Sequence, residues 1–138
     1  MVNLDYLCMK YGGRIAECEG KKTDKENLIT KALGVLQENG PYAMFLYLES
    51  QKGEKGVVNK CKTEILMLFR EEKLLANSLG VTKSVPENNA EFKDIIEWLR
   101  DVSSDLDCLL FFKQICQQVM LYARYHVKAL EEETEEEK

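Results

Sequence analysis

The sequence predicts an all-α protein, a compact bundle of about five helices with a tight Asn-Gly-Pro corner between the first two and a long C-terminal helix. Only two prolines occur among the 138 residues, and most glycines stand at expected corners, which argues against a β-sandwich. Apolar residues recur at intervals of three and four over several stretches, the spacing of one helix face. A chain of this length is expected to form one core without metals or disulfides.

Three parts are expected along the chain. We predict an N-terminal segment over residues 1–22, a helical bundle domain over residues 23–130 and an acidic tail over residues 131–138. The tail is expected to be frayed or disordered, because like charges one helical turn apart repel each other.

The N-terminal segment has two local interpretations. Asn3 to Lys10 fits a short helix that ends at Gly12-Gly13, and Arg14 to Cys18 could equally be extended. The segment has no basic stretch followed by a long apolar run, so a secretory signal is not expected. No stretch of about 18 uncharged apolar residues occurs anywhere, so no membrane span is expected either.

The first two helices of the bundle are marked by a capping signature and a sharp corner. Thr23 and Glu26 form a capping-box pattern just before a periodic apolar run. That helix is expected to end at Asn39, with Gly40 in the left-handed conformation and Pro41 in the first turn of the next helix. The second helix is apolar almost all round, which indicates enclosure by the core or by a neighbouring subunit.

The third helix is expected from about Val57 to Leu79, after a loop rich in Lys and Gly. Apolar residues at intervals of three and four give it one buried stripe, and charged residues fill the other side. Gly80 is expected to stop this helix, and a polar connection follows it.

Two further helices complete the predicted bundle. A fourth helix is expected over about Ala90 to Arg100, with Trp98 on its flank. The last helix is expected over about Asp105 to Leu130, because Ser104 and Asp107 form a second capping-box pattern at its start.

The net charge of −5 comes from the tail alone. Residues 131–138 contain six Glu and one Lys, which leaves 18 basic and 18 acidic side chains in residues 1–130. A neutral body lacks the strong positive charge that identifies many nucleic-acid-binding domains. The tail itself is expected to be a solubilising end, with nucleic-acid mimicry or regulation as the alternative.

Neither a metal site nor a cofactor is predicted. The odd number of cysteines, the absence of a C-x-x-C pair and the single histidine argue against zinc. We expect structural thiols in a reducing cytoplasm, and so a cytoplasmic protein. The five cysteines are Cys8, Cys18, Cys61, Cys108 and Cys116.

No enzymatic activity is predicted. His126 with Lys128 nearby permits a phosphotransfer hypothesis, but a histidine on an ordinary helix is more often structural. Asp105 and Asp107 are better explained as acids that complement a helix dipole. The paired glycines do not follow a strand at phosphate-loop spacing.

Basic side chains fall into three groups, each of which is more often an ordinary solvated face than a binding site. Any contact with nucleic acid would be to the backbone, because no base-reading motif is present. The first choice for phosphate contact is the group on the last helix, which recurs on one face. The groups are Lys113, Arg124 and Lys128; Lys52, Lys55, Lys60 and Lys62; and Lys21, Lys22 and Lys25.

Two runs of the chain resemble a known family, the small helical subunits of type III CRISPR–Cas effector complexes. The runs are ALGVLQENGPYAMFLYLES and LLFFKQICQQVMLYARYHVKAL. The first is similar to a helix that ends in a short Asn-Gly element before an apolar, aromatic-rich helix. The second is similar to the closing helix of those proteins. The likeness covers about residues 27–51 and 106–130.

The resemblance implies a non-catalytic architectural subunit. Copies would stack along an RNA-guided complex and contact the target RNA backbone without sequence selectivity. The implied partners are other CRISPR effector subunits, the guide RNA/target RNA duplex and copies of itself, with no membrane. Stacking requires exposed patches, although the candidates are also compatible with the core. The candidate subunit contacts are Tyr42, Phe45, Tyr47, Phe111 and Leu121.

The main alternative is a small helical adaptor that binds a protein partner and no nucleic acid. The neutral body and acidic tail favour it. A basic groove along the last helix would favour the CRISPR interpretation, whereas neutral surfaces with one apolar groove would favour the adaptor.

Overall fold

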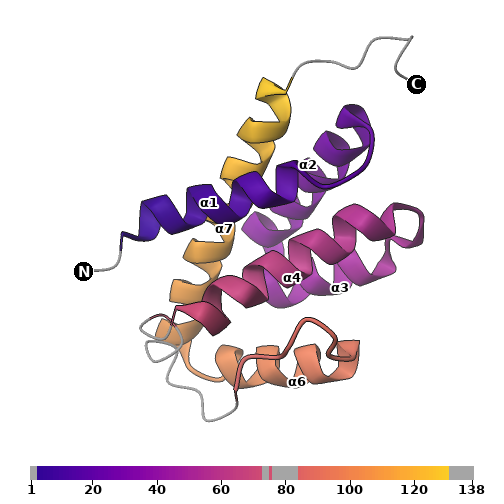
Figure 1. Cartoon of the computed structure of the whole chain (residues 1–138). Coiled ribbons are helices and arrows are strands. Elements are labelled where there is room, and N and C mark those ends of the chain that lie inside the picture. The colour runs from indigo at the N-terminus through magenta and orange to yellow at the C-terminus, as the bar shows by residue number, and fades with distance from the viewer. Residues whose placement is uncertain (1–2, 73–74, 76–83, 131–138) are drawn as a thin grey trace, which may run out of the picture.

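The computed structural model describes residues 3–72, 75 and 84–130, and this part of the chain is helical without any strand (Figure 1). The predicted all-α class is therefore confirmed for these residues. Six α-helices are described, one more than the approximate number expected. They are α1 (Leu4–Ala16), α2 (Lys22–Asn39), α3 (Pro41–Ser50), α4 (Lys55–Glu71), α6 (Phe92–Ser103) and α7 (Leu106–Ala129), with a short 3₁₀ turn η1 (Lys52–Glu54) before α4.

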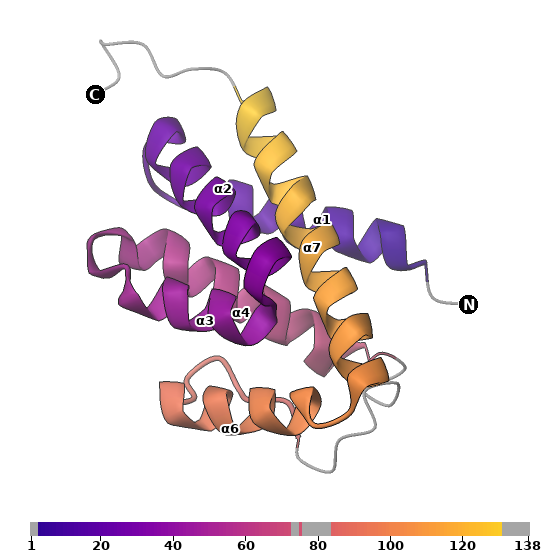
Figure 2. The same cartoon turned by 180° about the vertical axis from the view of Figure 1, so that it is seen from behind.

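The long helix α7 is the axis of the fold. Helix α1 crosses it, and α2 packs along it, as the two opposite views show (Figures 1 and 2). Helix α4 packs under α1, α3 packs against α2, and α6 lies across the lower end of the bundle. Residues 27–51 therefore form most of α2 and all of α3, and residues 106–130 form α7 and its C-cap.

The lower core is built on three aromatic rings. Phe112 of α7 lies 5.0 Å from Phe69 of α4 and 5.4 Å from Trp98 of α6, measured between ring centroids. The prediction that Trp98 occupies a flank is wrong, since it is only 1% exposed. The edge-on approach of its indole to Phe112 gives an aromatic contact in addition to the buried area.

The two glycines of α1 do not end the helix. The predicted helix over Asn3 to Lys10 is present, but α1 continues through Gly12 and Gly13 to Ala16, so the predicted end at these glycines and the extended form after Arg14 are wrong. A Cβ atom on Gly12 would lie 2.6 Å from the Val119 carbonyl oxygen and 2.9 Å from the Ala123 nitrogen of α7. Gly12 therefore permits a close approach of two helix backbones, and this packing stabilises a helix that its local sequence disfavours.

Both predicted capping boxes are displaced. Helix α2 begins at Lys22 and no side chain caps it, so Thr23 already lies inside the first turn. At the start of α7 the cap is Asp105, whose carboxylate accepts from the Cys108 amide at 3.1 Å. Ser104 instead closes α6, where its hydroxyl donates to the Asp101 carbonyl at 2.7 Å.

The Asn-Gly-Pro segment forms the junction between α2 and α3. Helix α2 ends at Asn39, and α3 begins at Pro41. Gly40 has φ 94° and ψ 175°, a region that only glycine populates readily, and it differs from the expected left-handed helical conformation. In α3, Met44 and Phe45 are fully buried whereas Leu46 is 45% exposed, so the protein's own core encloses only part of this apolar helix.

Other boundaries differ modestly from expectation. Helix α4 ends at Glu71, and the predicted continuation to Leu79 with a stop at Gly80 falls largely outside the described residues. Helix α6 starts at Phe92 and continues three residues beyond Arg100. The acidic tail over residues 131–138 also lies outside the described part.

Candidate nucleic-acid interface

Helix α7 carries positive charge and no negative charge over most of its length. No Asp or Glu occurs from Cys108 to Leu130, although the chain has 24 acidic residues. Lys113, Arg124 and Lys128 recur along one side of this helix, and we call them the α7 basic seam. With about 1.5 Å rise per residue, the seam extends roughly 22 Å along the axis.

Two members of the seam lie over the junction between α7 and α2. The Lys113 ammonium donates to the Gln37 carbonyl oxygen at 3.3 Å, at the C-terminal end of α2. The Lys128 ammonium lies 3.9 Å from a Glu26 carboxylate oxygen near the start of α2. The two contacts place both cations on the α2–α7 junction. They also require the two helices to run antiparallel, as Figure 2 shows.

Arg124 lies between these two contacts on α7 and is half-buried. Its Nε atom is buried and has no hydrogen-bond partner among the described residues, and no carboxylate there pairs with its guanidinium. A guanidinium offers five N–H donors in a planar fork. Arg124 is therefore the seam cation with the greatest unused capacity to bind an oxyanion.

The seam is weakly neutralised. The Lys128–Glu26 contact is long, and its side chains are 43% and 34% exposed, so it contributes little to stability. A carboxylate held this loosely can be exchanged for a phosphate oxygen at low energetic cost. Lys22 adds a fourth cation, because its ammonium donates to the Leu130 carbonyl at 3.0 Å. No local sequence pattern predicts the contact between Lys22 and Leu130, because the two residues are far apart in the chain.

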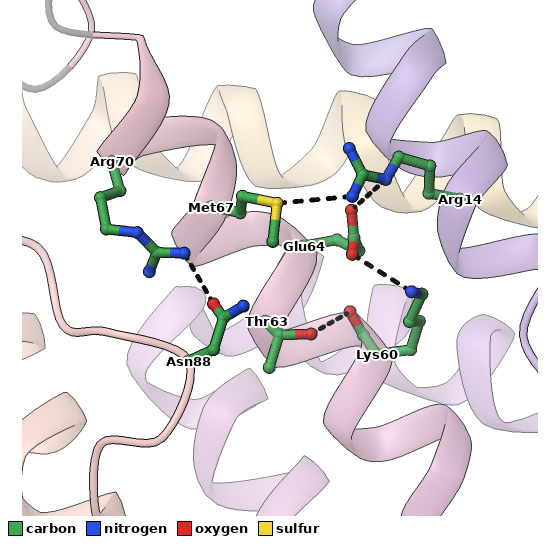
Figure 3. Close-up of polar contacts among 7 residues, drawn as sticks. All are labelled: Arg14, Lys60, Thr63, Glu64, Met67, Arg70 and Asn88. Atoms are coloured by element: carbon green, nitrogen blue, oxygen red, sulfur yellow. Dashed lines mark hydrogen bonds and ion pairs between the residues drawn. The ribbon is translucent and has the colours of Figure 1, made fainter.

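In the second predicted basic group, Lys60 neutralises a buried acid. The Glu64 side chain is only 2% exposed, and its two oxygens face Arg14 Nε at 2.8 Å and Lys60 Nζ at 3.4 Å (Figure 3). The Arg14 contact lies outside hydrogen-bonding geometry, so its attraction is chiefly Coulombic. A buried carboxylate needs such partners. Lys60 is therefore a poor candidate for RNA contact.

Lys62 also has a structural role in the protein interior. It is buried, its ammonium lies 3.1 Å from a Glu49 carboxylate oxygen, and it stands 5.7 Å from the centre of the Phe92 ring. These contacts join α4 to α3 and α6, so the assignment of Lys62 to an RNA surface is corrected. Lys52 and Lys55 remain exposed on η1 and at the start of α4.

In the third group, Lys25 is buried and acts as a helix cap. Its ammonium donates to the Ala16 carbonyl at 2.7 Å and to the Cys18 carbonyl at 2.9 Å. These oxygens lie at the C-terminal end of α1, where a positive charge is favourable. Lys25 is therefore a structural residue.

The five predicted subunit contacts are not a single exposed patch. Phe45 is 0% exposed, so it belongs to the core, and its assignment as a contact is corrected. The other four are half-buried against the core: Tyr42, Tyr47, Phe111 and Leu121.

The apolar side chains that do reach the surface were not singled out from the sequence. On α7 they are Leu106 at 67%, Leu110 at 52% and Tyr125 at 57% exposure. Leu106 and Leu110 lie one turn apart at the start of the helix, so they form a small apolar surface near Lys113.

Three of the five cysteines are buried core residues, whereas Cys18 and Cys108 are half-buried. Burial raises the pKa of the Cys8 thiol to about 11, and burial likewise raises the pKa of Cys61 and of Cys116. Thiols of this kind stay protonated and unreactive near neutral pH. Among the described residues, no group of three or more His, Cys, Asp or Glu side chains is placed to hold a metal ion.

His126 lies on the exposed side of α7 and covers Gly13 of α1. A Cβ atom on Gly13 would lie 3.4 Å from the His126 Nε2 atom. This contact gives the histidine a packing role at the crossing of the two helices.

Comparisons with protein-family models, curated proteins and solved structures found no match. Within the described ranges, no helix combines the length and apolar character needed to cross a membrane.

Proposed function

We propose that this chain is a non-catalytic small subunit of a type III CRISPR RNA-guided effector complex and contacts the target RNA backbone. The observation that carries the RNA contact is the α7 basic seam, three cations on a helix without acidic residues from Cys108 onward. The resemblance of residues 27–51 and 106–130 to the small-subunit family supports the assignment to such a complex.

The chemistry of the seam favours phosphate over base recognition. Lysine ammonium groups attract phosphates as point charges, and the guanidinium of Arg124 can engage two phosphate oxygens at once. Such contacts position a strand and carry no direct sequence information. Binding through the seam would therefore be indifferent to sequence and would weaken as salt concentration rises.

Contacts with other subunits or with further copies would use the apolar surface at the start of α7. Leu106 and Leu110 are both more than half exposed and lie beside the seam. Half-buried Tyr42, Tyr47, Phe111 and Leu121 could extend such contacts only at their exposed edges.

The same apolar surface favours the alternative function, a protein–protein adaptor with no nucleic-acid role. Leu106 and Leu110 would then receive an apolar partner, and the seam would be an ordinary solvated face. The two functions differ in one property, because only the CRISPR subunit requires affinity for RNA.

A salt-titrated binding assay tests the proposal. Labelled single-stranded RNAs of unrelated sequences are titrated with the full chain and with a chain that lacks residues 131–138. Equal affinity for all sequences, with a steep decline as salt rises, would support the RNA-binding subunit. Absence of binding at low salt to either protein would overturn RNA contact and favour the adaptor.

A further inference from the structure

We infer that a cavity at the lower end of the α7 basic seam binds one nucleotide of the RNA strand. The cavity has a volume of about 540 Å³ and lies between the α2–α3 junction, the end of α6 and the first turns of α7. This volume is within the range of small-molecule sites. The inference rests on the proposed function, and it adds a specific pocket and a ligand unit to the extended phosphate surface.

Two cations from different helices line the cavity. Arg100 of α6 donates from Nε to the Tyr42 hydroxyl at 3.1 Å, and no other polar partner holds its guanidinium among the described residues. Lys113 of α7 also lines the cavity, and its ammonium donates to the Gln37 carbonyl. The lining contains a single carboxylate, that of Glu38. The balance of charge therefore favours an anionic group between Arg100 and Lys113.

The remaining lining suits the uncharged part of a nucleotide. Pro41, Leu109 and Leu110 provide apolar surface, and the Tyr42 side chain adds an aromatic wall. Nucleobases bind such surfaces by stacking and by apolar contact. Ser103 and Asn39 also line the cavity, so polar groups of a sugar or base would find polar residues there.

The position of the cavity identifies an RNA strand as the source of this nucleotide. Lys113 belongs both to the cavity lining and to the α7 basic seam. A strand whose phosphates follow Lys128 and Arg124 along α7 would therefore arrive at the cavity mouth. A cavity of the same composition on another part of the surface would not be reached by a strand that follows the seam.

The first test maps where RNA touches the full chain. Single-stranded RNA that contains 4-thiouridine is bound, irradiated and digested, and the crosslinked peptides are identified by mass spectrometry. Crosslinks in residues 38–42 or 103–110 are expected. Crosslinks confined to other segments would overturn the inference, even if the RNA affinity itself is preserved.

A matched pair of substitutions on α6 measures the contribution of the cavity. Arg100→Glu removes a cavity cation, whereas Lys93→Glu makes the same charge change at a side chain that is 74% exposed and outside the cavity lining. Arg100→Glu should lower RNA affinity about tenfold, the loss expected for one charged hydrogen-bonded contact. Lys93→Glu should leave affinity near the wild-type value, and equal losses in both variants would contradict a specific role for the cavity.

Titration with small probes separates this inference from the proposed function. Adenosine 5′-monophosphate and inorganic phosphate are each added to the full chain, and binding is followed by NMR. The nucleotide should bind more tightly than phosphate and should lose affinity in Arg100→Gln, a variant that retains a polar side chain. Lys93→Gln, at an exposed side chain outside both the seam and the cavity lining, should bind the nucleotide normally.

The combined results distinguish a failure of the cavity inference from a failure of the proposed function. If the seam variants lower RNA affinity but the nucleotide does not bind, only the cavity inference is overturned. If the nucleotide binds as expected but the full chain has no affinity for RNA, the proposed function and the RNA strand as the ligand are both overturned, and the cavity is a site for free nucleotides. Phosphate binding as tight as that of the nucleotide would reduce the cavity to an anion site and overturn the inference.

Discussion

Two helix junctions of this protein contain similar basic side chains that serve different purposes. At the α1–α4 junction, Arg14 and Lys60 enclose the buried carboxylate of Glu64 (Figure 3). At the α2–α7 junction, the only carboxylate paired with the basic seam among the described residues is the part-exposed Glu26. At these two junctions the burial of the partner acid differs, with Glu64 2% exposed and Glu26 34% exposed, and this difference separates the structural cations from those free to bind a ligand.

The largest expected effect comes from reversing the charge of the α7 basic seam. Lys113→Glu, Arg124→Glu and Lys128→Glu combined should lower RNA affinity at least about 100-fold, because several charged contacts are lost together. A binding titration at several salt concentrations measures the loss, together with a flatter salt dependence.

A control for that variant changes an equal number of exposed cations elsewhere. Lys10, Lys31 and Lys93 are exposed on α1, α2 and α6, and their combined change to Glu gives the same net charge. An equal loss of affinity in this control would mean that the seam is not the site and that only net charge matters.

The second effect is on stability and concerns the α1–α4 junction. Glu64→Gln leaves Arg14 and Lys60 side by side without their acid, and it should lower the free energy of unfolding by about 2 kcal/mol. Both cations are 38% exposed and can regain water, which keeps the loss below that of a fully buried pair. Urea denaturation measures the loss, with exposed Glu17→Gln as control; an unchanged midpoint would refute the structural role of this cluster.

A smaller effect is expected at alkaline pH. Burial, with a contribution from Glu71, raises the pKa of Tyr11 to about 12 in the folded protein. Because the folded state holds this proton more tightly than the unfolded chain, the contribution of Tyr11 to stability is complete below pH about 10 and decreases as pH rises toward 12.

Tyr11→Phe isolates that contribution. The variant should lose less stability than the wild type between pH 10 and 12, as followed by urea denaturation at each pH. Tyr125→Phe, at a ring that is 57% exposed, serves as the control and should follow the wild-type curve. Parallel curves for wild type and Tyr11→Phe would contradict the raised pKa.

The smallest expected effect concerns the acid at the α2–α7 junction. Glu26→Gln removes the part-exposed acid from the α2–α7 junction, and it should change the free energy of unfolding by less than about 0.5 kcal/mol. RNA affinity should rise about twofold, since Lys128 no longer has a competing partner. Reduced RNA affinity in this variant would mean that Glu26 positions the lysine for binding.

The candidate site could be predicted only in part from the sequence. The grouping of Lys113, Arg124 and Lys128 on one face follows from helical periodicity, and the structure places all three on α7. The burial of Lys62 could not be inferred in the same way, because its partner Glu49 lies on another helix. The cavity cation Arg100 had no local signal either, since its surroundings come from three separate segments.

The sequence by itself determined the all-helical class and the positions of the main helices. Apolar spacing, the Gly40–Pro41 junction and the lack of strand signals act within a few residues, so they can be recognised locally. The tertiary structure decided that Gly12 is a crossing point and not a helix end, because the Val119 carbonyl that approaches it is distant in the chain. It also decided which basic residues are free, since burial and ion pairing depend on contacts between helices, which no local pattern records.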